Sequence, residues 1–537
     1  MSIVDGTRTN GRSDVEDVQR LRPNQLGIPM ILFMVVAFSA PITAMTGNVP
    51  VAVGYGNGWG APAGFVIATI VLSIFSVGYT VMARYITSAS PFYGYIAHGI
   101  SKPIGMASGL LVMCGYMVIE AALVGIFAAF AKITLADQLG IDLPWHVYAA
   151  FMLALIAILS YFEINFAARV LAVMLILELS ILLLMSFAVL FSGGGPDGIP
   201  LEAISPVNAF KGNGVASAAV GLGLFMAFWS WIGFEATAVY GEESRNPRRV
   251  IPIATFVAVI GIGVMYTFFS WMAVSGNGLT QSVALASGDD PFQLFFAPTR
   301  EYLGSWGIDV FQWLLLTGSF ACGFAVHNTA ARYLYTLGRE GFIHRALGRT
   351  HGKHGSPHVA SFAQTGVATT IVLLFALFDQ DPYLSLFVLG AIFATMAILI
   401  VQTLSSFAVI GYFHVHKRHP ENHHILETLV APLVGGIAMI AVVYLLIDNL
   451  DAAAGAAAKT LIFDLIPWIV VGIFVFGFLA ALYLRSARPE AYDRIAWIIY
   501  RDTAERDEVG PGEPRAAPPV GEMGAGAGPG QAERPLR

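Results

Sequence analysis

The sequence predicts an all-α polytopic membrane protein with twelve transmembrane helices, built as a 5+5 inverted repeat plus two additional helices. Three observations lead to this fold class. The 537 residues are 56% hydrophobic and only 12% charged, whereas a soluble domain has roughly 25% charged residues. Twelve apolar runs are long enough to cross a bilayer, and lysine and arginine concentrate in alternate loops. The first and sixth runs are interrupted in corresponding places.

Composition already excludes several classes of function. A spanning helix needs about 20 apolar residues, and 56% of the chain, about 300 residues, is enough for twelve. The net charge of −6 comes from 29 Lys and Arg against 35 Asp and Glu, which leaves no basic excess for a nucleic-acid partner. Cys114 and Cys322 lie in apolar runs without metal-ligand spacing. We therefore expect no disulfide, metal or cofactor.

The apolar runs divide the chain into three parts. We expect a cytoplasmic N-terminal segment (1–25) without a cleavable signal, a membrane domain (26–484) and a cytoplasmic tail (485–537). The tail is rich in Ala, Gly, Pro and Glu, a composition typical of disorder. The spans are expected near 27–53, 61–82, 104–131, 145–164, 170–192, 214–240, 251–274, 306–337, 358–378, 383–413, 428–447 and 462–484.

The basic residues test this topology independently of hydropathy. If the N-terminus is cytoplasmic, the inner segments before the tail contain sixteen basic residues: Arg8, Arg12, Arg20, Arg22, Arg84, Lys102, Arg169, Arg245, Arg248, Arg249, Arg339, Arg345, Arg349, Lys353, Lys417 and Arg418. The outer loops hold four: Lys132, Lys211, Arg300 and Lys459. This bias follows the positive-inside rule, so both termini are expected in the cytoplasm of a cell with the protein in its plasma or inner membrane.

Spans 1 and 6 are poor uninterrupted helices. Span 1 contains Pro41 and Pro50, and span 6 contains Gly233 and Glu235 in mid-membrane. An unpaired backbone group in lipid costs several kcal/mol, so a broken helix persists only where it is buried in protein or lines a watery cavity. Because proline removes a donor, the first helix is expected to open over residues 39–43. For each break alone, the alternative is a structural kink.

The spacing of the two breaks indicates a transporter. Each interrupted span begins a set of five helices, and because five is odd, successive sets run through the membrane in opposite directions. Where two breaks meet, half-helix N-termini offer amides to an anion and freed carbonyls face a cation, which suits a zwitterionic amino acid. The predicted substrate-binding residues at the breaks are Ser39, Ala40, Pro41, Ile42, Thr43, Trp229, Ser230, Trp231, Ile232, Gly233 and Phe234.

These residues also carry a family resemblance. The segment WSWIGFEATAVYGEESRNPRRVIPIA resembles the sixth-helix signature of the amino acid, polyamine and organocation (APC) transporters, and ARYLYTLGREG resembles the inner loop after their eighth helix. The resemblance in hydropathy covers residues from about 25 to 485. It implies a LeuT-like fold, transport of an amino acid or amine, and Trp229 as a lid or side-chain wall. The Gly-x-Gly run that many members have at the first break is replaced here by Ser39, Ala40 and Pro41.

Three acidic residues fall inside the predicted membrane domain. An ionised side chain at the bilayer centre costs roughly 3 kcal/mol, so Glu120, Glu178 and Glu235 are functional candidates. A buried carboxyl group that gains and loses a proton as water access alternates would couple proton entry to substrate entry. Glu178 and Glu235 are the proton-coupling candidates, and some proton-coupled relatives carry a lysine in place of Glu178. The alternative is a protonated glutamate bonded to a neighbouring helix.

Span 3 contributes a further face to the predicted site. Tyr116 and Glu120 lie one helical turn apart. If this face lines the cavity, Glu120 pairs with a cationic group of the substrate, and its exchange for Gln selectively weakens basic substrates. Trp229 and Trp231 point about 200° apart on a continuous helix, so at most one faces the cavity. His327, in span 8, is more often a satisfied interhelical partner than a proton relay.

A charged cluster follows span 6. Glu242 and Glu243 precede Arg245, Arg248 and Arg249, close to the helix-ending Asn246-Pro247 pair. We predict an inner gate in which Glu243, Arg249, Arg339 and Glu340 take part. The alternative is a solvated loop that only follows the positive-inside rule.

The sequence thus predicts a secondary transporter for amino acids or amines, working by alternating access and proton symport within a lipid bilayer. A Walker-type phosphate loop is absent from the sequence, so an ion gradient is the expected energy source. An exchanger without net ion coupling and a substrate sensor that does not translocate remain alternatives. An enzyme is not expected because the spans contain no nucleophile-base motif. The oligomeric state is not defined by the sequence.

Overall fold

The computed structural model describes residues 21, 23–161, 164–352, 354–419 and 424–496. Within this part of the chain, eleven helices are long and apolar enough to cross a membrane. The span expected at 145–164 is the shorter apolar helix α6 (Trp145–Ser160). Each expected span thus corresponds to an apolar helix, and the all-α polytopic fold class is confirmed.

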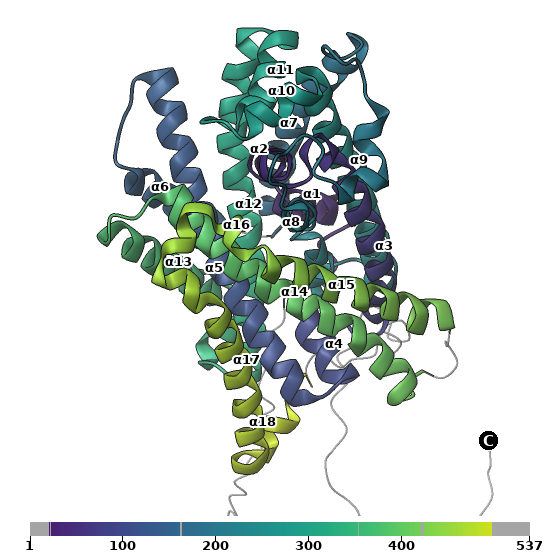
Figure 1. Cartoon of the computed structure of the whole chain (residues 1–537). Helices are drawn as coiled ribbons and strands as arrows, with labels where there is room; N and C mark the ends of the chain where they lie inside the picture. The colour runs from purple at the N-terminus through teal and green to yellow at the C-terminus, as the bar shows by residue number, and fades with distance from the viewer. Residues whose placement is uncertain (1–20, 22, 162–163, 353, 420–423, 497–537) are drawn as a thin grey trace, which may run out of the picture.

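The transmembrane helices form two sets of five and an additional pair (Figure 1). The first set comprises the broken helix α1 (Ile28–Phe38) and α2 (Pro41–Val51), then α3 (Ala61–Tyr85), α5 (Lys102–Leu139), α6 and α7 (Ile164–Phe191). The second comprises the broken helix α8 (Val220–Trp229) and η5 (Phe234–Glu243), then α9 (Pro247–Asn277), α12 (Ser305–Glu340), α13 (His358–Leu377) and α14 (Val388–Ile410). The additional pair is α15 (Ala431–Asp448) and α17 (Leu461–Ala487).

Short helices complete the described chain. The short α-helices are α4 (Pro91–Gly99), α10 (Leu279–Ala286), α11 (Gln293–Leu303), α16 (Leu450–Ala454) and α18 (Pro489–Asp493). The 3-10 helices are η2 (Gly58–Gly60), η3 (Leu201–Ile204), η4 (Pro206–Phe210), η5, η6 (Arg345–Gly348) and η11 (Gly455–Lys459). Four π-helical segments extend or precede three of the spans: η1 (Ala52–Gly56), η7 (Pro382–Phe387), η8 (Gly411–Val415) and η10 (Leu426–Val430).

The two sets of five are arranged with opposite orientation. Between its second and third long helices, the first set has α4 at the lower end of the molecule, and the second set has α10 and α11 at the upper end (Figure 1). Corresponding helices also pack against each other, α3 against α9 and α5 against α12. This is the arrangement that an inverted repeat produces.

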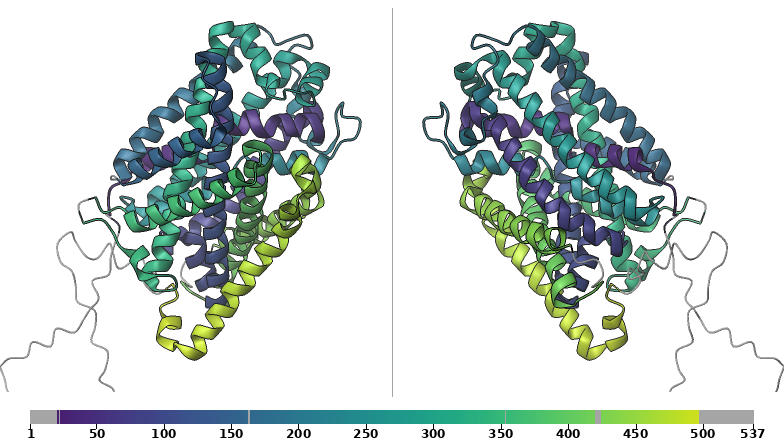
Figure 2. Two further views of the ribbon diagram at one scale, coloured as in Figure 1. Left: turned by 90° about the vertical axis from the view of Figure 1, so that its left-hand side faces the viewer. Right: turned by 90° about the vertical axis from the view of Figure 1, so that its right-hand side faces the viewer.

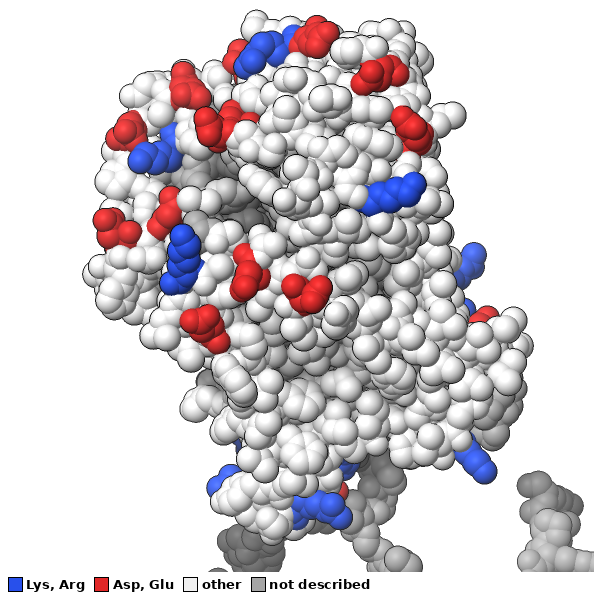
Figure 3. Space-filling view, in the orientation of Figure 1, with Lys and Arg blue, Asp and Glu red and all other residues white. Residues whose placement is uncertain are grey.

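The outer helices present apolar side chains to the surroundings. α17 runs along the outside of the bundle (Figures 1 and 2), and its Trp468, Phe476 and Tyr483 are each at least 66% exposed. The face in Figure 3 has a belt nearly free of charge, with acidic and some basic side chains above it and mainly basic side chains at the lower end. Such a belt is compatible with lipid, since the helical backbone satisfies its own hydrogen bonds.

The predicted tail begins with ordered structure. α17 continues to Ala487, and α18 follows it, so the first residues of the predicted tail are helical. Lys102 Nζ lies 3.1 Å from the Asp493 carbonyl oxygen, and the amide of Ala496 donates to Tyr93 Oη at 3.0 Å. Backbone groups of Asp493 and Ala496 make these contacts, and the Gly- and Pro-rich stretch begins only later in the sequence. Residues 497–537, like residues 1–20, lie outside the described part of the chain.

Candidate functional site

The first break is shorter than the sequence predicts. α1 ends at Phe38, Ala40 adopts the left-handed conformation (φ 46°, ψ 68°), and α2 starts at Pro41. Pro41, Ile42 and Thr43 therefore belong to the first turn of α2 rather than to the opening. The first helical position suits proline, because its missing N–H has no intrahelical partner there in any case. Pro41 thus begins a helix here, and Ser39 and Ala40 form the break.

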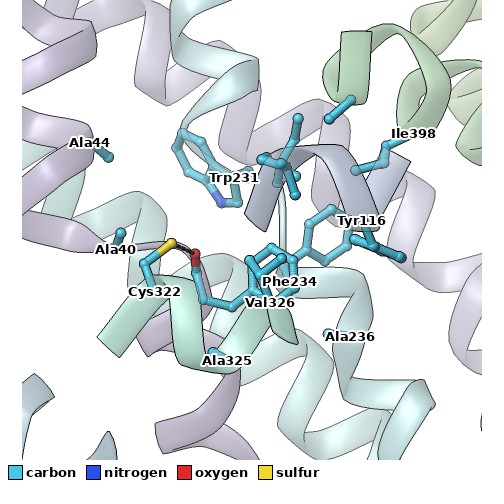
Figure 4. Close-up of a cluster of buried hydrophobic side chains, with 14 of the residues drawn as sticks. Ala40, Ala44, Tyr116, Trp231, Phe234, Ala236, Cys322, Ala325, Val326 and Ile398 are labelled. Carbon is cyan, nitrogen blue, oxygen red and sulfur yellow. Dashed lines mark hydrogen bonds between the residues drawn. The ribbon is translucent and has the colours of Figure 1, made fainter. Parts of the chain in front are cut away.

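Neighbouring helices satisfy the carbonyl groups that the first break frees. Tyr266 on α9 donates its hydroxyl to the Ser39 carbonyl at 2.7 Å. Cys322 on α12 donates its thiol to the Phe38 carbonyl at 3.0 Å. Figure 4 shows Cys322 close to Ala40 in this packed cluster. The break is therefore buried in protein, as broken membrane helices must be.

Removing the hydroxyl of Tyr266 tests this arrangement. Tyr266→Phe leaves the Ser39 carbonyl without its donor, and we expect the free energy of unfolding to fall by about 1–2 kcal/mol, the upper part of the range for interhelical bonds in membranes. Tyr444→Phe is the matched control, because Tyr444 is 62% exposed on α15. Equilibrium unfolding in mixed micelles measures both variants. Equal stability of the two variants would show that the bond does not hold the break.

Two groups at the start of α2 are buried without conventional partners. Thr43 Oγ1 and both carboxyl oxygens of Glu178 have no hydrogen-bond partner of standard geometry in the described part of the chain. The Glu178 carboxyl group, on α7, faces the backbone amide of Ile42. It also packs against Gly318, where a Cβ atom would lie 2.4 Å from Glu178 Oε2. Unsatisfied polar groups are rare in protein interiors.

The second break lies between α8 and η5. α8 ends at Trp229, residues 230–233 form a turn, and Gly233 has φ 116°. Glu235 is fully buried and caps this turn. Its Oε2 accepts from the Gly233 amide at 3.0 Å, and its Oε1 accepts from the Tyr116 hydroxyl at 2.9 Å. Tyr116 on α5 is thus connected to the second break.

The two breaks lie against each other. A Cβ atom at Gly233 would lie 2.1 Å from the ring of Phe38, the last residue of α1. Asn48 on α2 donates to Ser230 Oγ at 2.9 Å, which links the two broken helices directly. Figure 4 shows Trp231 and Phe234 packed around this junction with Ala40 and Ala44 on its other side. The two breaks thus form one junction, in a conformation with their side chains closely packed.

The two tryptophans of the second break point to different neighbours. Trp231 is fully buried, donates to the Val259 carbonyl at 3.3 Å and packs edge-on against Tyr266. Trp229 is half-buried and stacks with Phe387 of η7. Ile232 and Phe234 are buried. This divergence agrees with the expectation that at most one of the two tryptophans faces a cavity.

Glu120 is not brought to the breaks. Although it is one turn from Tyr116 on α5, its carboxyl group lies 3.0 Å from His327 Nδ1 on α12 and accepts from Gln364 Nε2 on α13 at 2.7 Å. All three side chains are fully buried. Both oxygens of Glu120 are therefore engaged by neighbouring helices in this conformation. The sequence showed the spacing on α5 but not which neighbours this side of the helix meets.

Two ion pairs close the predicted cytoplasmic end. Arg332 Nε and Nη2 donate to Glu243 at 2.8 Å and 3.1 Å, and Arg339 donates to Glu242 at 2.9 Å. The guanidinium of Arg332 also lies 4.8 Å above the ring of Tyr240. The Arg332–Glu243 pair is buried. Of the residues predicted for an inner gate, Glu243 thus pairs with Arg332, and Arg339 pairs with Glu242.

The other predicted gate residues have different surroundings. Glu340 accepts from Tyr93 and from the Ala496 amide, and Arg249 is exposed and takes no part in these pairs. The sequence did not single out Arg332 as the partner of Glu243. A single cation within an apolar span was the available signal, because such a charge requires a partner in the bundle.

The segment before α1 covers the same end. The amides of Gln25 and Leu26 donate to the Glu243 carbonyl at 2.9 Å and 3.0 Å, and the Arg245 amide donates to the Leu26 carbonyl. Leu26 is fully buried. The closure therefore combines the ion pairs with a backbone bridge from the N-terminal segment.

Helical sets of opposite orientation, adjoining breaks and a paired inner end define a membrane permease. The chain matches the amino acid permease family over residues 31–476 and belongs to that family. It is 21% identical over 439 residues to the branched-chain amino acid permease BcaP of Bacillus subtilis (strain 168), covering 78% of this chain and 85% of the relative.

Two further relatives are also transporters. The low-affinity putrescine importer PlaP of Escherichia coli (strain K12) is 22% identical over 391 residues, covering 70% of this chain and 78% of the relative. The b(0,+)-type amino acid transporter 1 of Oryctolagus cuniculus is 28% identical over 171 residues, covering 31% of this chain and 33% of the relative. The APC resemblance seen in the sequence is thereby confirmed.

Proposed function

We propose that this protein imports an amino acid or a related amine across the cell membrane by alternating access, coupled to protons. The observation that carries the proposal is the junction of the two broken helices, which places the start of α2 beside the turn at residues 230–233. Helix N-termini attract carboxylate groups, and freed carbonyls attract ammonium groups. The kinds of substrate named for BcaP and PlaP, an amino acid and a diamine, carry such groups.

We infer that contacts at the predicted cytoplasmic end keep the protein closed there in this conformation. Arg332 and Glu243 connect α12 to η5, and Leu26 connects the segment before α1 to the same element. Both broken helices are therefore held at this end by contacts that separate without covalent change. Opening toward the cytoplasm requires these pairs to part. The contacts that form the inner gate thus belong to the same broken helices that we propose bind the substrate.

Glu178 provides a physical link between a proton and the first break. An ionised Glu178 is attracted to the amides at the start of α2, and a protonated one is attracted less. Gain or loss of one proton therefore changes the force that holds α2 in place. Glu235 has a corresponding position at the second break, where it accepts from Gly233 and Tyr116.

Transport by purified protein in liposomes tests the proposed function. Liposomes loaded with unlabelled leucine, lysine or putrescine are diluted into the labelled compound at equal pH, and exchange of at least one of them is expected. A substrate sensor would bind without exchange. In a second arm, an inwardly directed proton gradient should drive accumulation, whereas an exchanger without ion coupling would not respond.

Glu178→Gln tests the coupling role. Glutamine cannot ionise, so we expect accumulation driven by a proton gradient to fall at least tenfold, while exchange at equal pH remains detectable. Glu202→Gln is the control, because Glu202 is exposed in η3. Uptake assays at two external pH values measure the effect. Gradient-driven accumulation that is unchanged in Glu178→Gln would assign the coupling proton to another group.

A further inference from the structure

We propose that Glu120 and His327 together bind one proton, and that Ser361 and Ser160 connect this site to the predicted cytoplasmic face. The inference rests on the proposed proton coupling and adds a second site to it, away from the two helix breaks. Its residues come from four helices: Glu120 from α5, His327 from α12, Ser361 and Gln364 from α13, and Ser160 from α6.

The contacts form a continuous chain. His327 Nδ1 lies 3.0 Å from both carboxyl oxygens of Glu120, and His327 Nε2 lies 2.7 Å from Ser361 Oγ. Ser361 Oγ then donates to Ser160 Oγ at 2.7 Å. Gln364 Nε2 donates to Glu120 Oε2 at 2.7 Å. Every link is within hydrogen-bonding distance, so a proton can pass along the chain without a large movement of side chains.

The bonds of Ser361 set the protonation that this arrangement accommodates. When Ser361 donates its one hydroxyl proton to Ser160, its bond to His327 needs the proton of Nε2. A neutral imidazole then has a lone pair at Nδ1, which faces the carboxyl group of Glu120. Either Glu120 is a carboxylic acid or His327 is an imidazolium ion. In both cases the pair holds one proton more than a neutral histidine beside a carboxylate.

Loss of that proton leaves the pair with a net negative charge. The hydroxyl of Ser361 can then turn toward Nε2, so that Nδ1 donates its proton to the Glu120 carboxylate, but both side chains stay fully buried. The other groups that touch the pair, Gln364 and Ser361, are neutral. Further titratable groups on the same helices include Tyr116 on α5, which is bonded to Glu235, Arg332 on α12, which is paired with Glu243, and His358 at the start of α13. An uncompensated charge in the bundle is unfavourable, so the geometry of the pair suits the binding of one proton.

The chain of hydrogen bonds leads outward through Ser361 and Ser160. Relative exposure is 0% at Glu120 and His327, 4% at Ser361 and 7% at Ser160, and the next residue, Tyr161, is 37% exposed. Ser160 ends α6, and Ser361 is in the first turn of α13. The Tyr161 hydroxyl in turn lies 2.9 Å from His351 Nε2. These helix ends are on the side predicted to face the cytoplasm, so that side is where the proton is released.

The pair is mechanically connected to the gate. His327 precedes Arg332 by five residues in the continuous helix α12. A movement of α12 that separates Arg332 from Glu243 therefore also displaces His327 relative to Glu120. Separation of the pair removes the interaction that retains the proton. Opening of the cytoplasmic gate and release of the proton are thus expected to occur together.

The experiment compares exchange with proton-driven accumulation in liposomes, using whichever of leucine, lysine and putrescine the wild-type protein exchanges. For His327→Gln we expect exchange at equal pH within about twofold of wild type and a fall of at least tenfold in accumulation driven by a proton gradient. A pH-sensitive dye inside the liposomes should show a matching loss of proton influx. His146→Gln is the matched control, because His146 is exposed at the other end of α6.

Ser361→Ala removes the hydroxyl group that links His327 to Ser160 and leaves Glu120 unchanged. It provides a second test in case His327→Gln does not fold. We expect its exchange to be retained and its proton influx to slow at least threefold. The proposal would be overturned if His327→Gln kept the proton influx and accumulation of the wild type. If His327→Gln also lost exchange, the same result in Ser361→Ala would overturn it. A wild-type protein that exchanges substrate but ignores the proton gradient would overturn the proposed coupling itself, before any variant is compared.

Discussion

Replacing Arg332 by leucine is expected to lower the free energy of unfolding by about 3–5 kcal/mol, because it leaves the buried Glu243 carboxylate without its cation. Both side chains are at most 3% exposed and joined by two hydrogen bonds. The loss exceeds that expected for Arg339→Leu, since Glu242 is more accessible at 16%. Equilibrium unfolding in mixed micelles gives the comparison.

A double variant separates the ion pair from simple loss of packing. Arg332→Leu combined with Glu243→Leu removes both charges, and replacement of a whole buried pair is often neutral. We therefore expect the double variant to regain most of the stability that Arg332→Leu loses. Arg249→Leu is the control for the removal of one basic residue, because Arg249 is exposed. A double variant as unstable as the single one would show that the charge of Glu243 does not cause the loss.

Gly233→Ala is expected to reduce transport at least tenfold. Gly233 has φ 116°, which side chains other than hydrogen rarely tolerate, and the new Cβ atom would lie 2.1 Å from the Phe38 ring. Either the turn at residues 230–233 or the end of α1 must move. Both belong to the junction that we propose binds the substrate. Exchange in liposomes, normalised to the amount of folded protein, measures the loss.

A glycine in open surroundings provides the control for this substitution. A Cβ atom at Gly261, in the middle of α9, would have no neighbour within 4 Å. Gly261→Ala is therefore expected to leave transport unchanged and to stabilise the helix slightly, since alanine favours helix more than glycine does. Full exchange activity in Gly233→Ala would show that the second break does not require its left-handed residue.

The membrane fold was accessible from the sequence because hydropathy and charge act locally. Each span needs its own apolar run, and each loop has its own basic residues, so both signals are read without knowledge of the neighbours. Proline in span 1 and glycine with an acid in span 6 likewise marked the breaks. The structure differs from the prediction at Pro41, which starts α2 instead of lying in the opening. Ala40 takes the left-handed conformation, and alanine gives no sequence signal for it.

The partners of the polar residues could not be predicted in the same way. Glu120 and Tyr116 share a helix, but one meets His327 and the other meets Glu235, because α5 is surrounded by helices from both sets. Arg332 and Glu243 are 89 positions apart, and their pairing depends on how α12 packs beside η5. The sequence also did not predict that the chain is ordered up to Ala496. This end of the chain is bound by Tyr93 and Lys102, which lie hundreds of positions earlier in the sequence.

The central claim is that substrate binds at the junction of the two broken helices. The most direct test is an experimental structure of the protein in a lipid nanodisc, with a saturating concentration of a compound that it exchanges. We predict ligand density in contact with the first turn of α2 and with the turn at residues 230–233. Ligand bound elsewhere, or a continuous helix through residues 39–40 or 230–233, would contradict the account.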